Sequence, residues 1–180
     1  EMVRRSIKIS VYVIAPLMMG LAFMAEPLVR LVITEKWLMC IPYMRIFCIM
    51  YIFYPIHTSN LNAIKALGRS DIFLKLEVVK KIMGTVLLIS SMWFGVMAMT
   101  YSFLLSSFLS QIINSWPNRR LLNYKYSEQI IDILPSLLLS FLMGIIVYIV
   151  SFFGLNDLLT VVLQIGLGVI IYVVLSILLK

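Results

Sequence analysis

The sequence predicts an all-α polytopic membrane protein with six transmembrane helices. Of its 180 residues, 62% are hydrophobic and only 13% are charged. A soluble domain carries about a quarter charged residues, so this chain has too few to cover a surface that faces water. Its apolar residues fall into six runs, each near the roughly 20 residues that cross a bilayer as a helix. The runs are continuous and do not alternate apolar with polar residues, which excludes a transmembrane β-barrel.

Turn residues and charges separate the six expected spans from one another. We place them at about residues 9–33, 41–64, 71–93, 96–116, 130–153 and 158–179. The first contains Pro16 and the pair Glu26-Pro27, which predict a kink or break there. Pro55 predicts a local break inside the second span.

The lysines and arginines predict the orientation of the chain in the membrane. With both termini on one side, twelve of the fifteen cations share that side, and only Arg30, Lys36 and Arg45 lie on the other. The twelve are Arg4, Arg5, Lys8, Lys65, Arg69, Lys75, Lys80, Lys81, Arg119, Arg120, Lys125 and Lys180. The rule that positive loops stay inside makes that side, and both termini, cytoplasmic. The net charge of +7 gathers beside apolar segments, which favours anionic membrane lipids over nucleic acid as partners.

Motifs of soluble enzymes are absent from the sequence. It contains no glycine-rich phosphate loop, no HExxH and no GxSxG. Cys40 and Cys48 have no metal-site spacing, so we expect two packing residues, no metal and no cofactor. Transport is therefore favoured over catalysis.

The third span carries the densest group of intramembrane charges. At about 100° per residue, Glu77, Lys80 and Lys81 lie on one narrow arc of that helix. Ionisable groups in hydrocarbon are costly and usually face a bundle interior or a wet cavity. The arc predicts a basic patch that receives an anion. The alternative is that the helix starts deep in the cytoplasm and its lysines extend to the membrane surface.

Polar residues of the second span complete the candidate site. These residues are Arg45, His57 and Asn60, the latter two just after the break expected at Pro55. Broken helices with polar neighbours recur at transporter binding sites. A lone histidine is more often structural, and an arginine near a helix end can extend to the surface. In the fourth span, small polar residues such as Ser102 and Ser106 favour helix packing over a polar cavity wall.

Three segments closely resemble one family of membrane proteins. They are AEPLVRLVITEKW at 25–37, NLNAIKALGRSD at 60–71 and LKLEVVKK at 74–81. They resemble the polysaccharide-transporter branch of the multidrug/oligosaccharidyl-lipid/polysaccharide (MOP) flippase superfamily, the Wzx-type lipopolysaccharide and O-antigen flippases. The FGV triplet at 94–96 and the DILP start of the fifth span agree, so the resemblance covers essentially the whole chain.

The resemblance implies a fragment of a larger transporter. Family members are MATE-like, with 12–14 helices in two six-helix lobes. Residues 1–116 would be the last four helices of the second lobe, and residues 117–180 two additional helices. The implied cargo is an undecaprenyl-pyrophosphate-linked oligosaccharide, flipped across the bacterial inner membrane for lipopolysaccharide or exopolysaccharide biosynthesis. Other membrane proteins of polysaccharide assembly are further candidate partners.

Two other functions stay open at the level of sequence. A drug or cation antiporter of the same fold needs buried acids, and Glu77 is the one strong intramembrane candidate. A membrane-embedded polymerase or acyltransferase needs a polar catalytic cluster or a large loop outside the membrane, and the sequence indicates neither.

Overall fold

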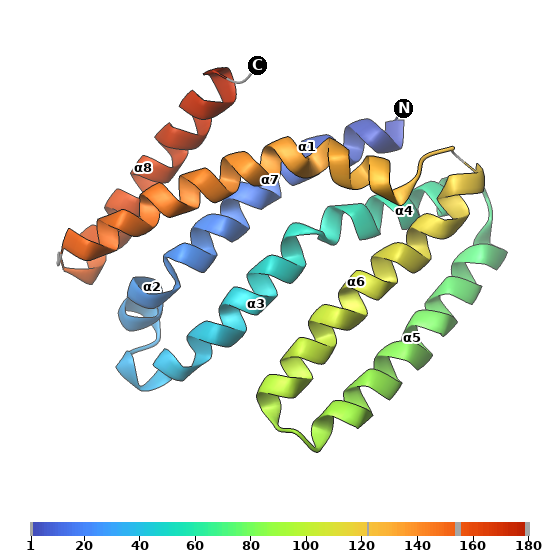
Figure 1. The fold of residues 1–180 in the computed structure, drawn as a ribbon, viewed down its shortest axis with the longest axis horizontal. Coiled ribbons are helices and arrows are strands. Elements are labelled where there is room, and N and C mark those ends of the chain that lie inside the picture. The colour runs from blue at the N-terminus through green and yellow to red at the C-terminus, as the bar shows by residue number, and fades with distance from the viewer. Residues whose placement is uncertain (1, 122, 154–155, 179–180) are drawn as a thin grey trace. The chain divides into compact units, whose positions relative to one another are not determined.

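The computed structural model describes residues 2–121, 123–153 and 156–178, and this part of the chain is helical without a strand. The all-α prediction is therefore confirmed. The elements in chain order are α1 (Met2–Phe23), α2 (Ala25–Val32), the 3₁₀ helix η1 (Glu35–Cys40), α3 (Ile41–Ile52), α4 (Tyr54–Ala66), α5 (Ser70–Met92), α6 (Val96–Leu121), α7 (Tyr126–Ile149), the 3₁₀ helix η2 (Val150–Phe153) and α8 (Asp157–Leu178) (Figure 1).

Five segments of the described residues are long and apolar enough to cross a membrane. They correspond to five of the six predicted spans. The exception is α5, which forms where the third span was predicted but carries Lys75, Glu77, Lys80 and Lys81 within its length. These charges make the helix too polar to count as a span by composition alone. Two residues of the sequence predictions, Leu179 and the cation Lys180, lie outside the described residues.

The breaks within the first two spans come where local chemistry permits them. Helix α1 runs through Pro16, and the interruption falls at Met24, just before the Glu26-Pro27 pair. In the second span, α3 ends at Ile52 and α4 begins at Tyr54, with Pro55 in the first turn of α4. A proline there costs little, because first-turn N–H groups have no helical acceptor. The break predicted at Pro55 is confirmed.

Two compact units make up the chain, and each is described by itself. The first comprises residues 1–10 and 53–133, and the second comprises residues 11–52 and 134–180. These units interleave along the sequence. The predicted boundary between residues 116 and 117 concerns the lobes of a larger transporter and stays a prediction.

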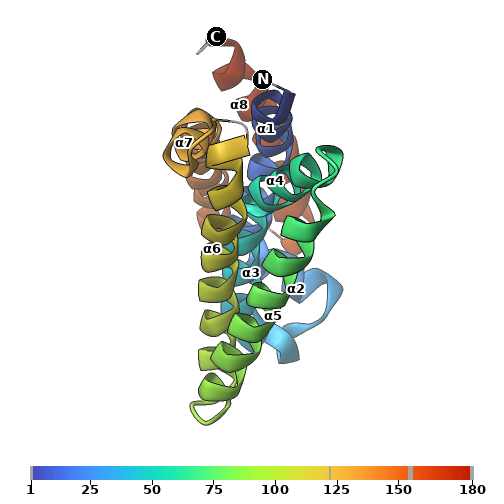
Figure 2. The same cartoon turned by 90° about the vertical axis from the view of Figure 1, so that its right-hand side faces the viewer.

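In the first unit, α5 and α6 form an antiparallel hairpin (Figures 1 and 2). Its turn contains Gly95 at φ 90°, a left-handed conformation that favours glycine. The hairpin packs through small residues, because a Cβ on Gly84 would come within 3.3 Å of the Ser106 hydroxyl. Farther along, the Ser91 hydroxyl donates to Ser102 at 3.0 Å. Both serines of α6 thus serve helix packing, the alternative that the sequence favoured.

In the second unit, α7 and α8 pack through a buried apolar cluster. It consists of Leu139, Met143, Val147 and Tyr172, with Met19 of α1 against it. Gly144 of α7 permits a close approach, since a Cβ there would lie 2.4 Å from the Phe23 ring. Large side chains on both helices therefore hold this end of α1 in a fixed register.

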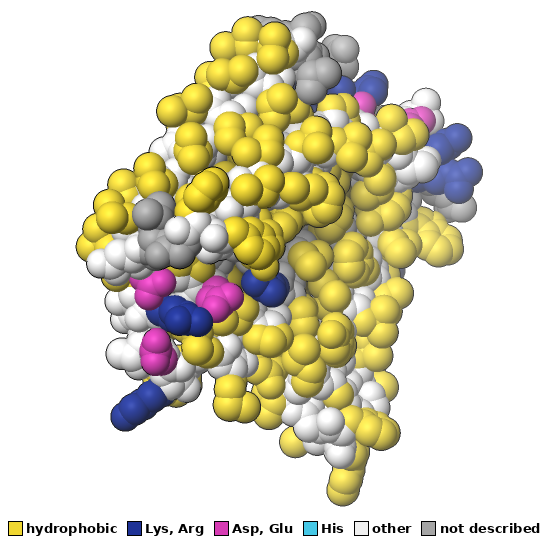
Figure 3. Space-filling view, turned by 60° about the vertical axis from the view of Figure 1, so that its left-hand side comes forward, with side chains coloured by type: hydrophobic (Ala, Val, Ile, Leu, Met, Phe, Trp, Pro, Cys, Tyr) yellow, Lys and Arg dark blue, Asp and Glu magenta, His cyan; other side chains and the backbone are white. Residues whose placement is uncertain are grey.

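The outer surface of the molecule is strongly apolar. Hydrophobic side chains cover most of the face in Figure 3, and charged side chains gather in a few groups. Trp93 and Phe94, at the α5–α6 turn, are 88% and 81% exposed. A soluble protein rarely exposes apolar surface so extensively, whereas lipid solvates it without cost.

Candidate functional site

Lys80 is the most deeply placed cation of the predicted site. Its side chain is only 8% exposed and forms a salt bridge with Glu77 one turn earlier on α5. A buried ammonium needs such a partner, because its desolvation is otherwise costly. Lys81 is exposed on the same helix. The three residues therefore differ in their surroundings, although the helical arc places them close together.

His57 and Asn60 lie in a group of polar side chains that we call the amide cluster, in which Asn60 is the centre of one hydrogen-bond network and His57 pairs separately with Asn114. It consists of His57, Asn60, Asn114, Ser115, Asn118 and Gln129. Helix α4 supplies the first two, α6 the next three, and α7 supplies Gln129. All six residues lie in the first unit.

Asn60 is the centre of the amide cluster and is fully buried. Its Nδ2 donates to Gln129 Oε1 at 2.8 Å and to Ser115 Oγ at 3.1 Å. Its Oδ1 accepts from Asn118 Nδ2 at 2.8 Å and from Gln129 Nε2 at 3.3 Å. Every hydrogen-bonding atom of this side chain is therefore used, which fixes α4, α6 and the start of α7 against one another.

His57 lies at the other end of the amide cluster. Its Nδ1 pairs with Nδ2 of Asn114 at 2.7 Å, and its ring stacks on Tyr54. Lys80 and Glu77 belong to α5, which packs against α4 in the same unit. The structure thus brings together four of the six predicted residues, Lys80, Glu77, His57 and Asn60, in one unit.

Two amide oxygens of the cluster have no hydrogen-bond partner among the described residues. They are Oδ1 of Asn114 and Oδ1 of Asn118, one turn apart on α6 and both in fully buried residues. A buried unpaired acceptor costs free energy. Both oxygens are shielded from solvent, so the two amides carry unsatisfied acceptors inside the first unit.

Arg45 is not among the residues that the structure brings together. It belongs to the second unit, is exposed, and donates to the backbone carbonyl of Ala22 at 3.3 Å. The contact joins α3 to α1, and the alternative from sequence, in which Arg45 extends to the membrane surface, stays a prediction.

An ion cluster around Asp132 was missed at the level of sequence. Arg4 and Lys8 both form salt bridges with this carboxylate, whose side chain is 5% exposed. Tyr124 donates to Asp132 at 2.8 Å. Burial and this carboxylate raise the pKa of Tyr124 above its ordinary value, so the hydroxyl stays a donor. The cluster joins the first turns of α1 to α7. Arg4 and Asp132 are 128 residues apart in sequence, so no local sequence pattern predicts their contact.

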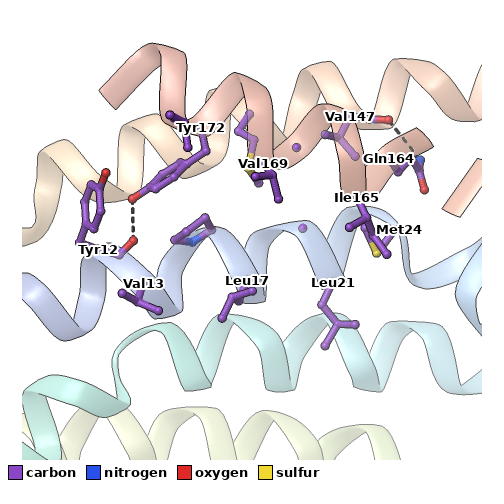
Figure 4. Close-up of a pocket in the computed structure, with 15 residues that line it drawn as sticks. Tyr12, Val13, Leu17, Leu21, Met24, Val147, Gln164, Ile165, Val169 and Tyr172 are labelled. Atoms are coloured by element: carbon purple, nitrogen blue, oxygen red, sulfur yellow. Dashed lines mark hydrogen bonds between the residues drawn. The ribbon is translucent and has the colours of Figure 1, made fainter. Parts of the chain in front are cut away.

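A second feature with binding geometry is an apolar groove in the second unit. It has a volume of about 510 Å³ and lies among α1, α7 and α8 (Figure 4). Its walls are aliphatic, with Val13, Leu17 and Leu21 on one side and Ile165 and Val169 on another. Gly20 and Gly168 also line it and leave it wide, since neither has a side chain. A groove of this kind fits hydrocarbon.

Polar groups mark both ends of the groove. At one end the Tyr172 hydroxyl donates to the backbone carbonyl of Tyr12 at 2.7 Å, and the Tyr12 hydroxyl contacts Ser176 at 2.6 Å. At the other end Gln164 donates to the Val147 carbonyl at 3.1 Å, while its own Oε1 has no partner among the described residues. The groove is therefore apolar along its length, and polar groups lie only at its two ends.

Metal-binding geometry does not occur in the described part of the chain. No three His, Cys, Asp or Glu side chains converge there. The groups available for binding in the candidate sites are cations, side-chain amides and apolar surfaces.

The helices and the apolar surface define an all-helical membrane protein that crosses the bilayer several times. Residues 1–42 match the sequence model of a family described as "Polysaccharide biosynthesis protein". That match supports a part in polysaccharide synthesis or transport. Comparisons with curated proteins and with solved structures find no match.

Proposed function

We propose that the protein is a flippase for undecaprenyl-pyrophosphate-linked oligosaccharides in the bacterial inner membrane. It would move repeat units for lipopolysaccharide or exopolysaccharide biosynthesis and would catalyse no covalent step. The family match over residues 1–42 supports the polysaccharide part of this proposal. The helices support the membrane part.

The apolar groove is the observation that carries the proposal. A cargo linked to a polyprenyl lipid brings a long hydrocarbon chain, and a groove of about 510 Å³ with aliphatic walls suits a length of such a chain. A soluble sugar or a hydrophilic drug would gain little from these walls. The groove therefore favours a lipid-linked cargo over the other transport substrates.

The buried salt bridge suits the charged part of the cargo. A diphosphate cannot enter hydrocarbon unless protein groups replace its water and counterions. Lys80 is buried, and Glu77 holds its charge in place. An arriving diphosphate would compete with Glu77 for the ammonium group.

The orientation is part of the same proposal. The twelve-to-three distribution of lysine and arginine supports an orientation with both termini in the cytoplasm, where lipid-linked repeat units are made.

Filling the groove tests the proposal. Gly168→Leu places a large side chain in the groove, because a Cβ at Gly168 already lies 3.5 Å from Val147. We expect surface polysaccharide to fall by about tenfold or more, since exclusion of several methylenes costs on the order of 0.8 kcal/mol each. The measurement is surface polysaccharide in cells that depend on this protein, at equal protein level.

The matched control is two residues away on the same helix. Gly166 is exposed and a Cβ there meets nothing within 4 Å, so Gly166→Leu adds the same side chain outside the groove. It should leave export unchanged. Normal export by Gly168→Leu at normal protein level would contradict a role for the groove.

A further inference from the structure

A second cavity lies in the first unit, between the end of α6 and the start of α7. It has a volume of about 330 Å³ and is separate from the amide cluster, although Ser115 belongs to both. The side chains that give it chemical character are Trp116, Arg119 and Lys125. None of the three was a candidate from sequence.

Its position in the chain corresponds to the surface of the bilayer. One apolar span ends at Arg119, and the next begins at Tyr126. Both residues line the cavity. Trp116 is 71% exposed beside them, and exposed tryptophans are favoured at the depth of lipid headgroups. The cavity therefore opens where phosphate groups of the membrane are concentrated.

The cavity is lined by two cations that form no salt bridge within the described part of the chain. Neither Arg119 nor Lys125 has a salt bridge among the described residues, whereas Arg4, Arg30 and Lys80 each have one. Glu128 lies nearby, but its carboxylate accepts a hydrogen bond from the backbone N–H of Lys125 at 3.3 Å. Two cations beside one carboxylate leave a net positive charge, which favours an anion.

Backbone donors add to this charge. The first N–H groups of a helix have no acceptor within it, and α7 begins with Tyr126 and Ser127, which both line the cavity. The side chain directly before them is Lys125, and a lysine has no acceptor atom with which to cap them. Cations and helix N–H groups that face the same space are suited to a phosphate.

We propose that this cavity binds the headgroup phosphate of an anionic glycerophospholipid. The phosphate lies between Arg119 and Lys125, and the lipid chains run along Ile112 and Trp116. The cavity is at the small end of ligand pockets, which suits a headgroup better than an oligosaccharide. The site does not depend on the cargo proposed above, because it requires only a bilayer that contains anionic lipid.

Tryptophan quenching by brominated lipid tests the site. Trp37→Phe and Trp93→Phe leave Trp116 as the one tryptophan of the sequence. The protein is placed in phosphatidylcholine vesicles that contain increasing fractions of brominated phosphatidylglycerol. We expect Trp116 to report a preference for phosphatidylglycerol of about fivefold or more, which is the effect of one or more cations near a membrane surface. Arg119→Gln with Lys125→Gln should abolish the preference, so that the ratio between the two lipids falls to about one.

Two further variants separate the site from general charge and from misfolding. Lys36→Gln with Lys75→Gln removes two exposed cations elsewhere and should keep the preference. Arg119→Lys with Lys125→Arg keeps the charges and should also keep it. Equal quenching by brominated phosphatidylcholine and phosphatidylglycerol, or a preference that survives the glutamine pair, would overturn the proposal. Displacement of the lipid by a lower concentration of polyprenyl diphosphate would overturn it too, in favour of a cargo site.

Discussion

Asn60→Ala is expected to lower the free energy of unfolding by about 2–3 kcal/mol, because it removes the centre of a buried hydrogen-bond network. The Oε1 and Nε2 atoms of Gln129 would each lose a hydrogen bond to Asn60. The Nδ2 of Asn118 would lose one acceptor. Single hydrogen bonds in membrane proteins contribute less, about 0.6 kcal/mol on average. The effect is larger here because several buried atoms lose partners at once. Denaturant unfolding in mixed micelles measures it.

The control for this prediction is on the same helix. Asn62 is exposed and two residues later on α4, so Asn62→Ala makes the same chemical change outside the network. It should alter stability by less than about 0.5 kcal/mol. If both alanine variants unfold alike, the amide cluster does not stabilise the first unit.

Glu77→Leu is expected to destabilise the protein by about 3 kcal/mol, because it leaves Lys80 buried without its counterion. Glu77→Leu combined with Lys80→Leu should recover most of that loss, since two apolar residues replace a desolvated ion pair. The two single variants and the double variant form a thermodynamic cycle, and unfolding of each in mixed micelles supplies the coupling free energy.

The same cycle separates stability from transport. The double variant should be stable yet defective in export, because it lacks the ammonium group proposed to meet the diphosphate. Lys81→Leu removes an exposed cation and should affect stability little. Additive effects of the two single changes would show that the Lys80–Glu77 contact contributes nothing to the fold.

The fold followed from patterns that act over short distances in the sequence. Apolar runs and turn residues predicted the helices, and Pro55 predicted the break at Phe53 because a proline cannot donate to the preceding turn. Helix α5 differs from the other predicted spans in its composition. Its helix was predicted, but its five charges keep it from meeting the composition of a membrane span.

The candidate site was predictable only in part, for the same physical reason. The Lys80–Glu77 pair spans three residues on one helix, so the helical period reveals it. The partners of Asn60 lie 55 to 69 residues away. The carboxylate of Asp132 meets Arg4 across 128 residues. Contacts of that kind depend on how helices pack, which no local pattern encodes. The groove is similar, since α1 forms its walls together with α7 and α8, which come more than 100 residues later in the sequence.

Arg45 and Lys81 differ in exposure from the buried candidates. Both residues were candidates from sequence, and both are exposed in the structure, whereas Lys80 and Asn60 are buried. Their roles stay predictions. Angular position on a helix gives direction, but only the neighbouring helices decide which directions are buried.

The most direct test of the proposed function is translocation in reconstituted vesicles. A fluorescent polyprenyl-diphosphate-linked saccharide is placed in both leaflets, and a membrane-impermeant quencher is added outside. With the protein present, we expect nearly all of the fluorescence to be quenched as the inner lipid reaches the outer leaflet, and Gly168→Leu should slow this phase. Quenching that stops at the outer leaflet's share, as in vesicles without protein, would contradict the flippase proposal.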